Sequence, residues 1–106
     1  MNEKLIFERY FNGEKNPITP SIFGYKSVEC DGEIVVFELS EGEGLYHEHI
    51  VGCTSLLYNP KTNEICRIAL SQAFSTRAEA RNYVKNLTAD DIRAAARREV
   101  KVLGVI

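Results

Sequence analysis

Residues 22–39 read IFGYKSVEC, then DG, then EIVVFEL, and this stretch decides the fold. The dipeptide Asp31-Gly32 supplies the positive φ angles that a tight hairpin turn needs. Three apolar side chains alternate along the second arm and share one face: Val35, Phe37 and Leu39. We therefore expect two antiparallel strands, 22–30 and 33–39, with this apolar face turned toward the core.

A second hairpin is expected around the turn that follows Asn59. Pro60 presets φ at the first corner of this turn, and Asn63 tolerates a left-handed exit. The flanking strands are 46–58 and 65–74. Apolar positions of the second strand alternate to one side: Cys66, Ile68, Leu70 and Phe74. The two hairpins predict a four-stranded antiparallel meander with one face covered.

Two helices are expected to provide the cover. Thr76, followed three residues later by Glu79, forms a capping box for a helix over 77–87. Thr88 then begins a second helix, which Gly104 is placed to end. The buried side of that helix is expected to hold Ile92, Ala95, Ala96, Val100 and Leu103. The fold class is therefore α+β, a four-stranded antiparallel meander of two hairpins followed by two C-terminal helices.

The N-terminal residues 4–11 fit either a strand or a short helix. Their apolar alternation favours a strand, whereas Asn2 as a cap and Gly13 as a terminator favour a helix. We expect a short helix here, with the strand as the alternative. Residues 16–20 are expected to be irregular, because two prolines remove backbone donors and restrict their neighbours.

The 106 residues, 44% of them hydrophobic, fit one domain over 1–106. No run approaches the roughly 20 apolar residues of a membrane span, and the first residues are charged rather than those of a signal peptide. We expect a cytoplasmic protein without a membrane partner. The three cysteines have no close pair and lie in strand-like stretches, as reduced thiols of a core do: Cys30, Cys53 and Cys66.

Charge is unevenly distributed along the chain. Residues 26–66 carry a net charge of −6, and residues 67–106 carry +4. Six cations at four-residue spacing form one flank of each expected C-terminal helix: Arg77, Arg81, Lys85, Arg93, Arg97 and Lys101. An acidic middle and a basic end indicate an oriented surface for a partner. These six residues, called the basic set below, are the candidate partner-binding residues.

The clearest candidate for a chemical site is the pair His47 and His49. On a strand these side chains lie on one side, about 6.6 Å apart along the chain, so that two imidazoles can reach one metal ion. Cys53 lies roughly 13 Å farther on, and a third ligand has to come from elsewhere. Metal binding through the two histidines is an alternative function. We assign no metal ligand and no cofactor.

Catalytic motifs are missing from the sequence. Gly42-Glu43-Gly44 lacks the lysine and the following helix of a phosphate-binding loop, and no Gly-x-Ser-x-Gly motif occurs. Cys53 and Cys66 alternate with aliphatic residues, as core thiols do, and have no adjacent base. We therefore expect that the protein is not an enzyme.

Two segments, LLYNPKTNE at 56–64 and AFSTRAEARNYV at 73–84, resemble the hairpin and helix of the N-terminal arm-binding domains of phage tyrosine integrases. The likeness lies in the Tyr-x-Pro-Lys-Thr turn and in the Phe-Ser-Thr entry to a Glu-Ala helix. Such domains read DNA with a basic sheet face. The strands expected here carry glutamates instead: Glu29, Glu33, Glu38, Glu48 and Glu64. Because this charge repels phosphate, the resemblance bears on the local fold alone.

These observations favour binding over catalysis. We expect a noncatalytic protein-interaction module, an inhibitor or accessory protein that docks to a protein partner through a charge-polarised surface. In size and lack of motifs it resembles small proteins that phages and other mobile elements encode, including inhibitors of host defence complexes. Nucleic-acid backbone binding by the basic helix flanks is the alternative, although the isoelectric point near 5.7 opposes it. A homodimer that pairs acidic and basic surfaces is a further alternative.

Overall fold

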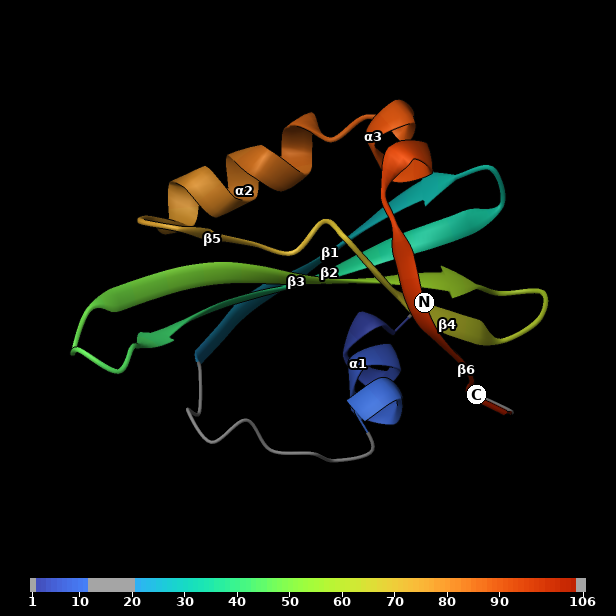
Figure 1. The fold of residues 1–106 in the computed structure, drawn as a ribbon, viewed down its shortest axis with the longest axis horizontal. Coiled ribbons are helices and arrows are strands. Elements are labelled where there is room, and N and C mark those ends of the chain that lie inside the picture. The colour runs from blue at the N-terminus through green and yellow to red at the C-terminus, as the bar shows by residue number, and fades with distance from the viewer. Residues whose placement is uncertain (1, 12–20, 105–106) are drawn as a thin grey trace.

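The computed structural model describes residues 2–11 and 21–104 (Figure 1). Within these residues the elements are α1 (Glu3–Phe11), β1 (Ser21–Cys30), β2 (Glu33–Glu43), β3 (His49–Asn59), β4 (Glu64–Ile68), β5 (Gln72–Phe74), α2 (Arg77–Asn86), α3 (Ala89–Ala94) and β6 (Arg97–Val102). The strands form one antiparallel sheet in the order β1-β2-β3-β4-β6, and β5 also pairs with β3. The predicted α+β class with an antiparallel sheet is confirmed.

The turn between β1 and β2 forms as the sequence predicts. Asp31 and Gly32 have φ angles of 54° and 79°, which a two-residue hairpin turn of this kind requires. They join Cys30 of β1 to Glu33 of β2, which lie opposite each other. β2 pairs in turn with β3, and Asn63 closes the next hairpin with a φ of 58°. Both turns are therefore set by residues that tolerate the left-handed region.

The predicted strand over residues 65–74 is divided in two. β4 and β5 both pair with β3, but the register shifts between them. At this break the Ser71 hydroxyl accepts a hydrogen bond from the Ser55 N–H at 3.0 Å. The Ser55 hydroxyl donates to the Ile68 carbonyl, also at 3.0 Å. Side-chain hydrogen bonds thus replace the ladder where the strand is interrupted.

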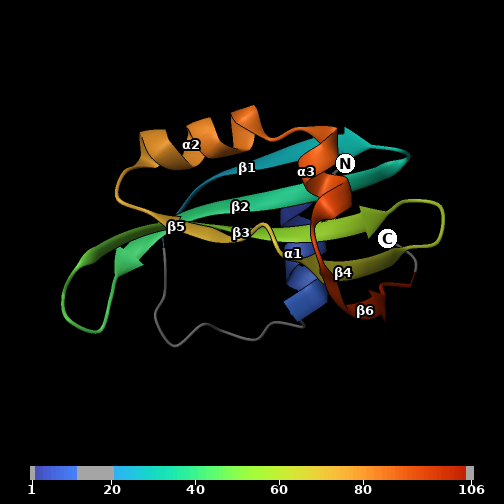
Figure 2. The same ribbon diagram turned by 45° about the horizontal axis from the view of Figure 1, so that its top comes forward.

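The sheet carries helices on both faces (Figures 1 and 2). The core under α2 and α3 includes Val35, Phe37, Leu39, Val51, Cys53, Leu57, Ile68, Ala80, Val84 and Ile92. The core under α1 consists of Ile6, Phe7, Tyr10, Val36, Leu56, Tyr58 and Ile65. Alternate residues of β2 and β3 therefore supply two cores, whereas the sequence predicts a cover on one face only.

Residues 4–11 lie in a helix, as expected. The Asn2 side chain accepts a hydrogen bond from the Leu5 N–H at 3.1 Å and so caps α1. The apolar stripe of α1 is buried against the sheet through Ile6, Phe7 and Tyr10. Gly13 and residues 16–20 lie outside the described residues. In the part of the chain that the structure covers, no helix combines the length and apolar content needed to cross a membrane.

Both C-terminal helices begin where the sequence predicts. The Thr76 hydroxyl accepts a hydrogen bond from the Glu79 N–H at 3.2 Å and donates one to the Glu79 carboxylate at 3.3 Å. The carboxylate does not bind the Thr76 N–H, so the predicted capping box is incomplete. Thr88 and Asp91 do form a complete capping box at the start of α3. Ala80, Val84 and Ile92 pack both helices against the same face of the sheet.

The second C-terminal helix is much shorter than the predicted helix over 88–103. α3 ends at Ala94, and the chain continues as β6, antiparallel to β4. Val100 and Val102 are β-branched and favour a strand, and β6 gives the edge of β4 the hydrogen-bond partners that a helix would not. Of the expected buried side, Ile92 is buried and Ala95 and Leu103 are half-buried against the two cores, whereas Ala96 and Val100 are exposed.

Candidate protein-interaction surface

The basic set does not form two helical ladders. The helix α2 carries three of its members: Arg77, Arg81 and Lys85. Arg93 lies on α3, whereas Arg97 and Lys101 lie on β6. The second ladder is therefore wrong, because the backbone becomes extended at Ala95, with a ψ of 136°.

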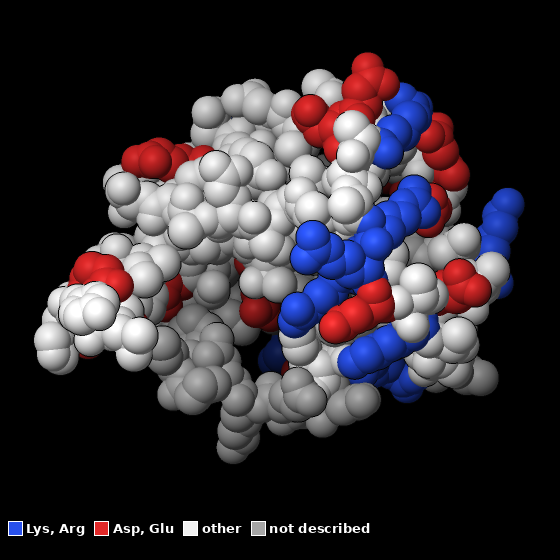
Figure 3. All heavy atoms as spheres, in the orientation of Figure 1, with Lys and Arg blue, Asp and Glu red and all other residues white. Residues whose placement is uncertain are grey.

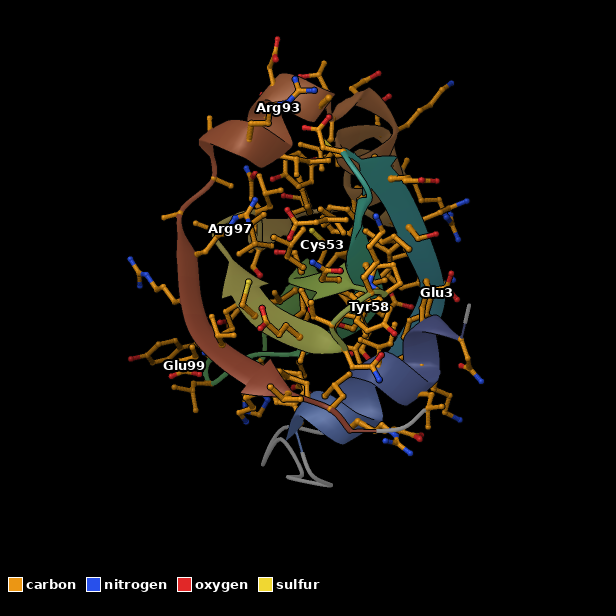
Figure 4. All side chains as sticks on the ribbon, turned by 90° about the vertical axis from the view of Figure 1, so that its right-hand side faces the viewer. Glu3, Cys53, Tyr58, Arg93, Arg97 and Glu99 are labelled. Carbon is orange, nitrogen blue, oxygen red and sulfur yellow. The ribbon has the colours of Figure 1, made fainter. Side chains whose placement is uncertain are left out.

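Arg93 and Arg97 each bind one carboxylate near the β1–β2 turn through two hydrogen bonds. Arg93 donates to both oxygens of Asp31, at 2.7 and 3.1 Å. Arg97 donates to both oxygens of Glu33, at 3.2 and 3.1 Å. Figure 4 looks onto this side of the molecule, with Arg93 on α3 and Arg97 at the start of β6. The Arg93 contact lowers the pKa of Asp31 and raises the pKa of Arg93 itself. Both guanidinium groups are thus engaged within the chain.

Two arginines of α2 contact the first strand. The Arg77 and Arg81 guanidinium groups lie over the Phe23 ring, 4.9 and 5.1 Å from its centre. Arg77 also forms an ion pair with Glu41 of β2. Arg81 has no carboxylate partner among the described residues. Arg77 therefore helps to fasten α2 to the sheet, while Arg81 keeps an unbalanced charge.

A second group of cations lies along the free edge of the sheet. The Lys101 ammonium donates to the Tyr10 carbonyl at 2.9 Å and lies over the Tyr10 ring. The Tyr10 hydroxyl donates to the Glu99 carboxylate at 3.0 Å, which also lies 3.9 Å from Arg67. We call the residues Arg67, Arg97, Arg98 and Lys101 the basic edge. Figure 3 shows Lys and Arg atoms gathered on the side of the molecule where β6 runs.

The β2–β3 hairpin ends in a tip, residues 44–48, that projects at one end of the molecule (Figures 1 and 2). Leu45 and Tyr46 at this tip are 84% and 88% exposed. They are the central residues of a turn that the His47 N–H closes by donating to the Gly44 carbonyl at 3.1 Å. The strand predicted over 46–58 begins only at His49, so the sequence does not single out this pair. The feature of the sequence that could have identified the tip is a pair of large apolar residues next to a glycine-rich acidic stretch.

The tip is held by its own hydrogen bonds. The Gly44 N–H donates to the Glu48 carbonyl at 2.8 Å, and the Tyr46 N–H donates to the Glu48 carboxylate at 2.8 Å. His47 adopts a φ of 64° and completes the turn. A Cβ atom at Gly44 would overlap the carboxyl end of the Glu48 side chain, which would have to move. The turn therefore presents Leu45 and Tyr46 outward in a defined arrangement.

His47 and His49 do not lie side by side on a strand. His47 belongs to the turn, and His49 begins β3. The His47 Nδ1 atom lies 2.5 Å from Glu43, and the His49 Nε2 atom lies 3.0 Å from Glu41. Over residues 2–11 and 21–104, no three His, Cys, Asp or Glu side chains are grouped as metal ligands. The geometry expected for a two-histidine metal site does not form.

All three cysteines are buried and reduced. Burial raises the pKa of Cys53 and of Cys66. A thiol with a raised pKa stays protonated and is a poor nucleophile. Cys53 and Cys66 both belong to the core under α2 and α3, as the sequence predicts for core thiols.

A shallow depression of about 540 Å³ lies between α2, α3 and the segment that follows β4. Leu70, Leu87 and Ala95 form part of its apolar wall. The Tyr83 hydroxyl at its side donates to the Leu70 carbonyl at 2.9 Å. Tyr83, Asn86 and Asp91 add polar groups to the same lining.

Comparison with protein-family models, curated proteins and solved structures found no match to this chain.

Proposed function

We propose that the protein is a noncatalytic protein-interaction module, an inhibitor or accessory protein that docks to a protein partner. One observation supports this proposal most directly: the exposed large apolar side chains of the described residues lie in two places. Four are at the hairpin end of the sheet: Ile22, Leu45, Tyr46 and Ile50. The other two, Val100 and Val102, are on the edge strand β6. Exposed apolar residues rimmed by polar ones are typical of protein-binding surfaces.

The two places also differ in charge, which supports docking through a charge-polarised surface. Glu43 and Glu48 flank the hairpin tip, whereas Arg98 and Lys101 belong to β6. In Figure 3, the hairpin end carries acidic atoms and no basic ones, whereas the Lys and Arg atoms gather at the opposite side, with acidic atoms among them. Such an uneven distribution of basic side chains orients a charged partner during encounter.

The small size of the chain and the lack of a recognisable catalytic motif in its sequence are the reasons for proposing a more specific role. Small inhibitors that phages and other mobile elements direct against host defence complexes share these properties. We include this role in the proposal.

The basic set has a smaller part in this proposal than its sequence spacing suggests. Arg93 and Arg97 are bound to Asp31 and Glu33. Arg81 and Lys85 on α2 form no ion pair within the residues that the structure describes. We therefore keep these two as the partner-binding candidates of the set.

Affinity capture of the tagged full-length chain, from the organism that carries it, tests the proposal. We expect a protein partner in stoichiometric amount, retained equally before and after nuclease treatment. An untagged chain serves as the control. Recovery of nucleic acid alone, or loss of all retained material after nuclease treatment, would contradict the proposal.

Nucleic-acid backbone binding is the second candidate function. The observation in its favour is the basic edge, in which Arg67 lies 3.9 Å from Glu99, and Arg98 and Lys101 form no ion pair with the residues that the structure describes. Phosphate is recognised by such clusters of Arg and Lys. The salt dependence of binding separates this candidate from protein docking, because each phosphate contact releases counterions.

A further inference from the structure

We propose that the hairpin tip inserts Leu45 and Tyr46 into an apolar pocket with a basic rim on a protein partner. This inference rests on the proposed function, and it names both the docking element and the chemistry of the surface that receives it.

The residue types at the turn are the first argument. The central positions of a solvated turn usually hold Gly, Asn, Asp, Ser or Pro, because the conformational preferences of these residues suit a turn. Here these positions hold Leu45 and Tyr46, and no core residue covers them, since both are more than four-fifths exposed. Tyrosine is enriched among the residues that dominate binding energy at protein interfaces. A large apolar pair at this position gains stabilisation only when a partner buries it.

The second argument is that the tip is already ordered before any partner binds. The Glu48 carboxylate fixes the Tyr46 N–H, and the His47 N–H closes the turn on Gly44. The two strands behind the tip remain paired up to Glu43 opposite His49. A preorganised element loses little conformational freedom on docking, so more of the contact energy appears as affinity.

Charge identifies the rim of the receiving pocket. Residues 41–49 contain three glutamates and neither lysine nor arginine. Glu41 is mostly covered and bound to Arg77, whereas Glu43 has a 64% exposed side chain beside the tip. Glu48 is also exposed. An apolar pocket bordered by Lys or Arg complements this arrangement.

The other exposed apolar strand is a weaker candidate for insertion. In β6, Glu99 has a φ of 52° at a register shift, which marks a bulge. Arg98 and Lys101 lie on either side of it. A bulge and flanking cations are the features by which natural proteins protect a sheet edge from pairing with other strands.

A photo-crosslinking residue at the tip tests the proposal in the native cell. The variant Tyr46→benzoylphenylalanine keeps an aromatic ring at the turn. Its matched control is Lys61→benzoylphenylalanine, at the exposed turn of the other hairpin. We expect a protein adduct from position 46 alone. The crosslinked site on the partner is expected to lie in an apolar pocket with Lys or Arg side chains at its rim. Adducts to nucleic acid, or equal adducts from both positions, would overturn the inference.

Binding of the captured partner, once purified, gives the quantitative test. We expect Leu45→Ala and Tyr46→Ala each to raise the Kd about tenfold or more, as residues at the centre of an interface do. Lys61→Ala is expected to leave the Kd unchanged. The variant Glu43→Gln/Glu48→Gln keeps the acceptor for the Tyr46 N–H but removes two charges. We expect it to slow association several-fold and to weaken its salt dependence.

The outcomes separate this inference from the proposed function. A partner that binds the wild type and both alanine variants equally overturns the inference and leaves the proposed function in place. Failure to capture any protein overturns both. Circular dichroism and thermal unfolding of each variant show whether a loss of binding arises from misfolding.

Discussion

At the scale of single residues, the shape of the tip depends on Gly44. A Cβ atom there would push the Glu48 side chain away from the Tyr46 N–H. We expect Gly44→Ala to lower the free energy of unfolding by about 0.5 to 1 kcal/mol, since one such hydrogen bond contributes about this much. Urea denaturation measures the change. The control is Gly24→Ala, whose Cβ would lie 3.8 Å from Leu39 in ordinary contact. Equal unfolding midpoints for the two variants would contradict the expectation.

The carboxyl group of Asp31 makes stability depend on pH. Hydrogen bonds from Arg93 lower its pKa below the ordinary value of 3.8. The folded state therefore binds fewer protons than the unfolded state, and this contribution is lost as the pH falls through the lowered pKa. We expect the unfolding free energy to fall between about pH 5 and pH 2, and to fall less in Asp31→Asn. Asparagine also tolerates the left-handed backbone at this position.

Urea midpoints measured at several pH values provide this test. The Asp91 pKa is also lowered, by its hydrogen bonds to Thr88, so the variant is expected to keep part of the pH dependence. If the urea midpoints of the wild type and Asp31→Asn change with pH in parallel, the Arg93 contact does not contribute to the pH dependence of stability.

At the scale of elements, the sequence predicts local structure best where turns and caps decide it. The turn at Asp31, the start of α2 after Thr76 and the start of α3 after Thr88 all lie where they were expected. β6 could not be predicted in this way. Ile92 and Val100 fit a helical spacing, and only the open edge of β4, a tertiary feature, makes the strand favourable. The prediction that Arg93, Arg97 and Lys101 share one helix is wrong for the same reason.

The Tyr10 hydroxyl is one of the groups that link α1 to β6, because it donates to the Glu99 carboxylate at 3.0 Å. Tyr10 is 1% exposed, so its hydroxyl has little access to water. We expect Tyr10→Phe to lower the unfolding free energy by about 1 kcal/mol, measured by urea denaturation. Tyr46→Phe is the matched control, because that hydroxyl is on an exposed side chain, and no change is expected there. A Tyr10→Phe midpoint equal to the wild type would show that the contact is not stabilising.

At the scale of the whole molecule, the fold brings together charges that are separated in the sequence. Arg93 and Asp31 are 62 positions apart, and Arg97 and Glu33 are 64 apart. The sequence shows an acidic block and a basic block, but their pairing depends on α3 and β6 lying beside the β1–β2 turn. The sequence therefore identifies the cations of the basic set, but it does not show that Arg77, Arg93 and Arg97 form ion pairs within the chain. The exposed tip at the other end of the molecule was missed, because the alternation of its neighbours resembles a continuing strand.

This internal pairing leads to a prediction about nucleic-acid binding. Six cations on duplex phosphates would give a slope of log affinity against log salt of about −5, whereas three would give about −3. Three members of the basic set, Arg81, Lys85 and Lys101, form no ion pair with the residues described in the structure, whereas Arg77, Arg93 and Arg97 do. We therefore expect a slope no steeper than about −3 for a labelled duplex in fluorescence anisotropy. Arg81→Glu should reduce the slope further, and Lys61→Glu, with the same change in charge, should not. A slope near −5 would show that the ion pairs of Arg93 and Arg97 open to phosphate.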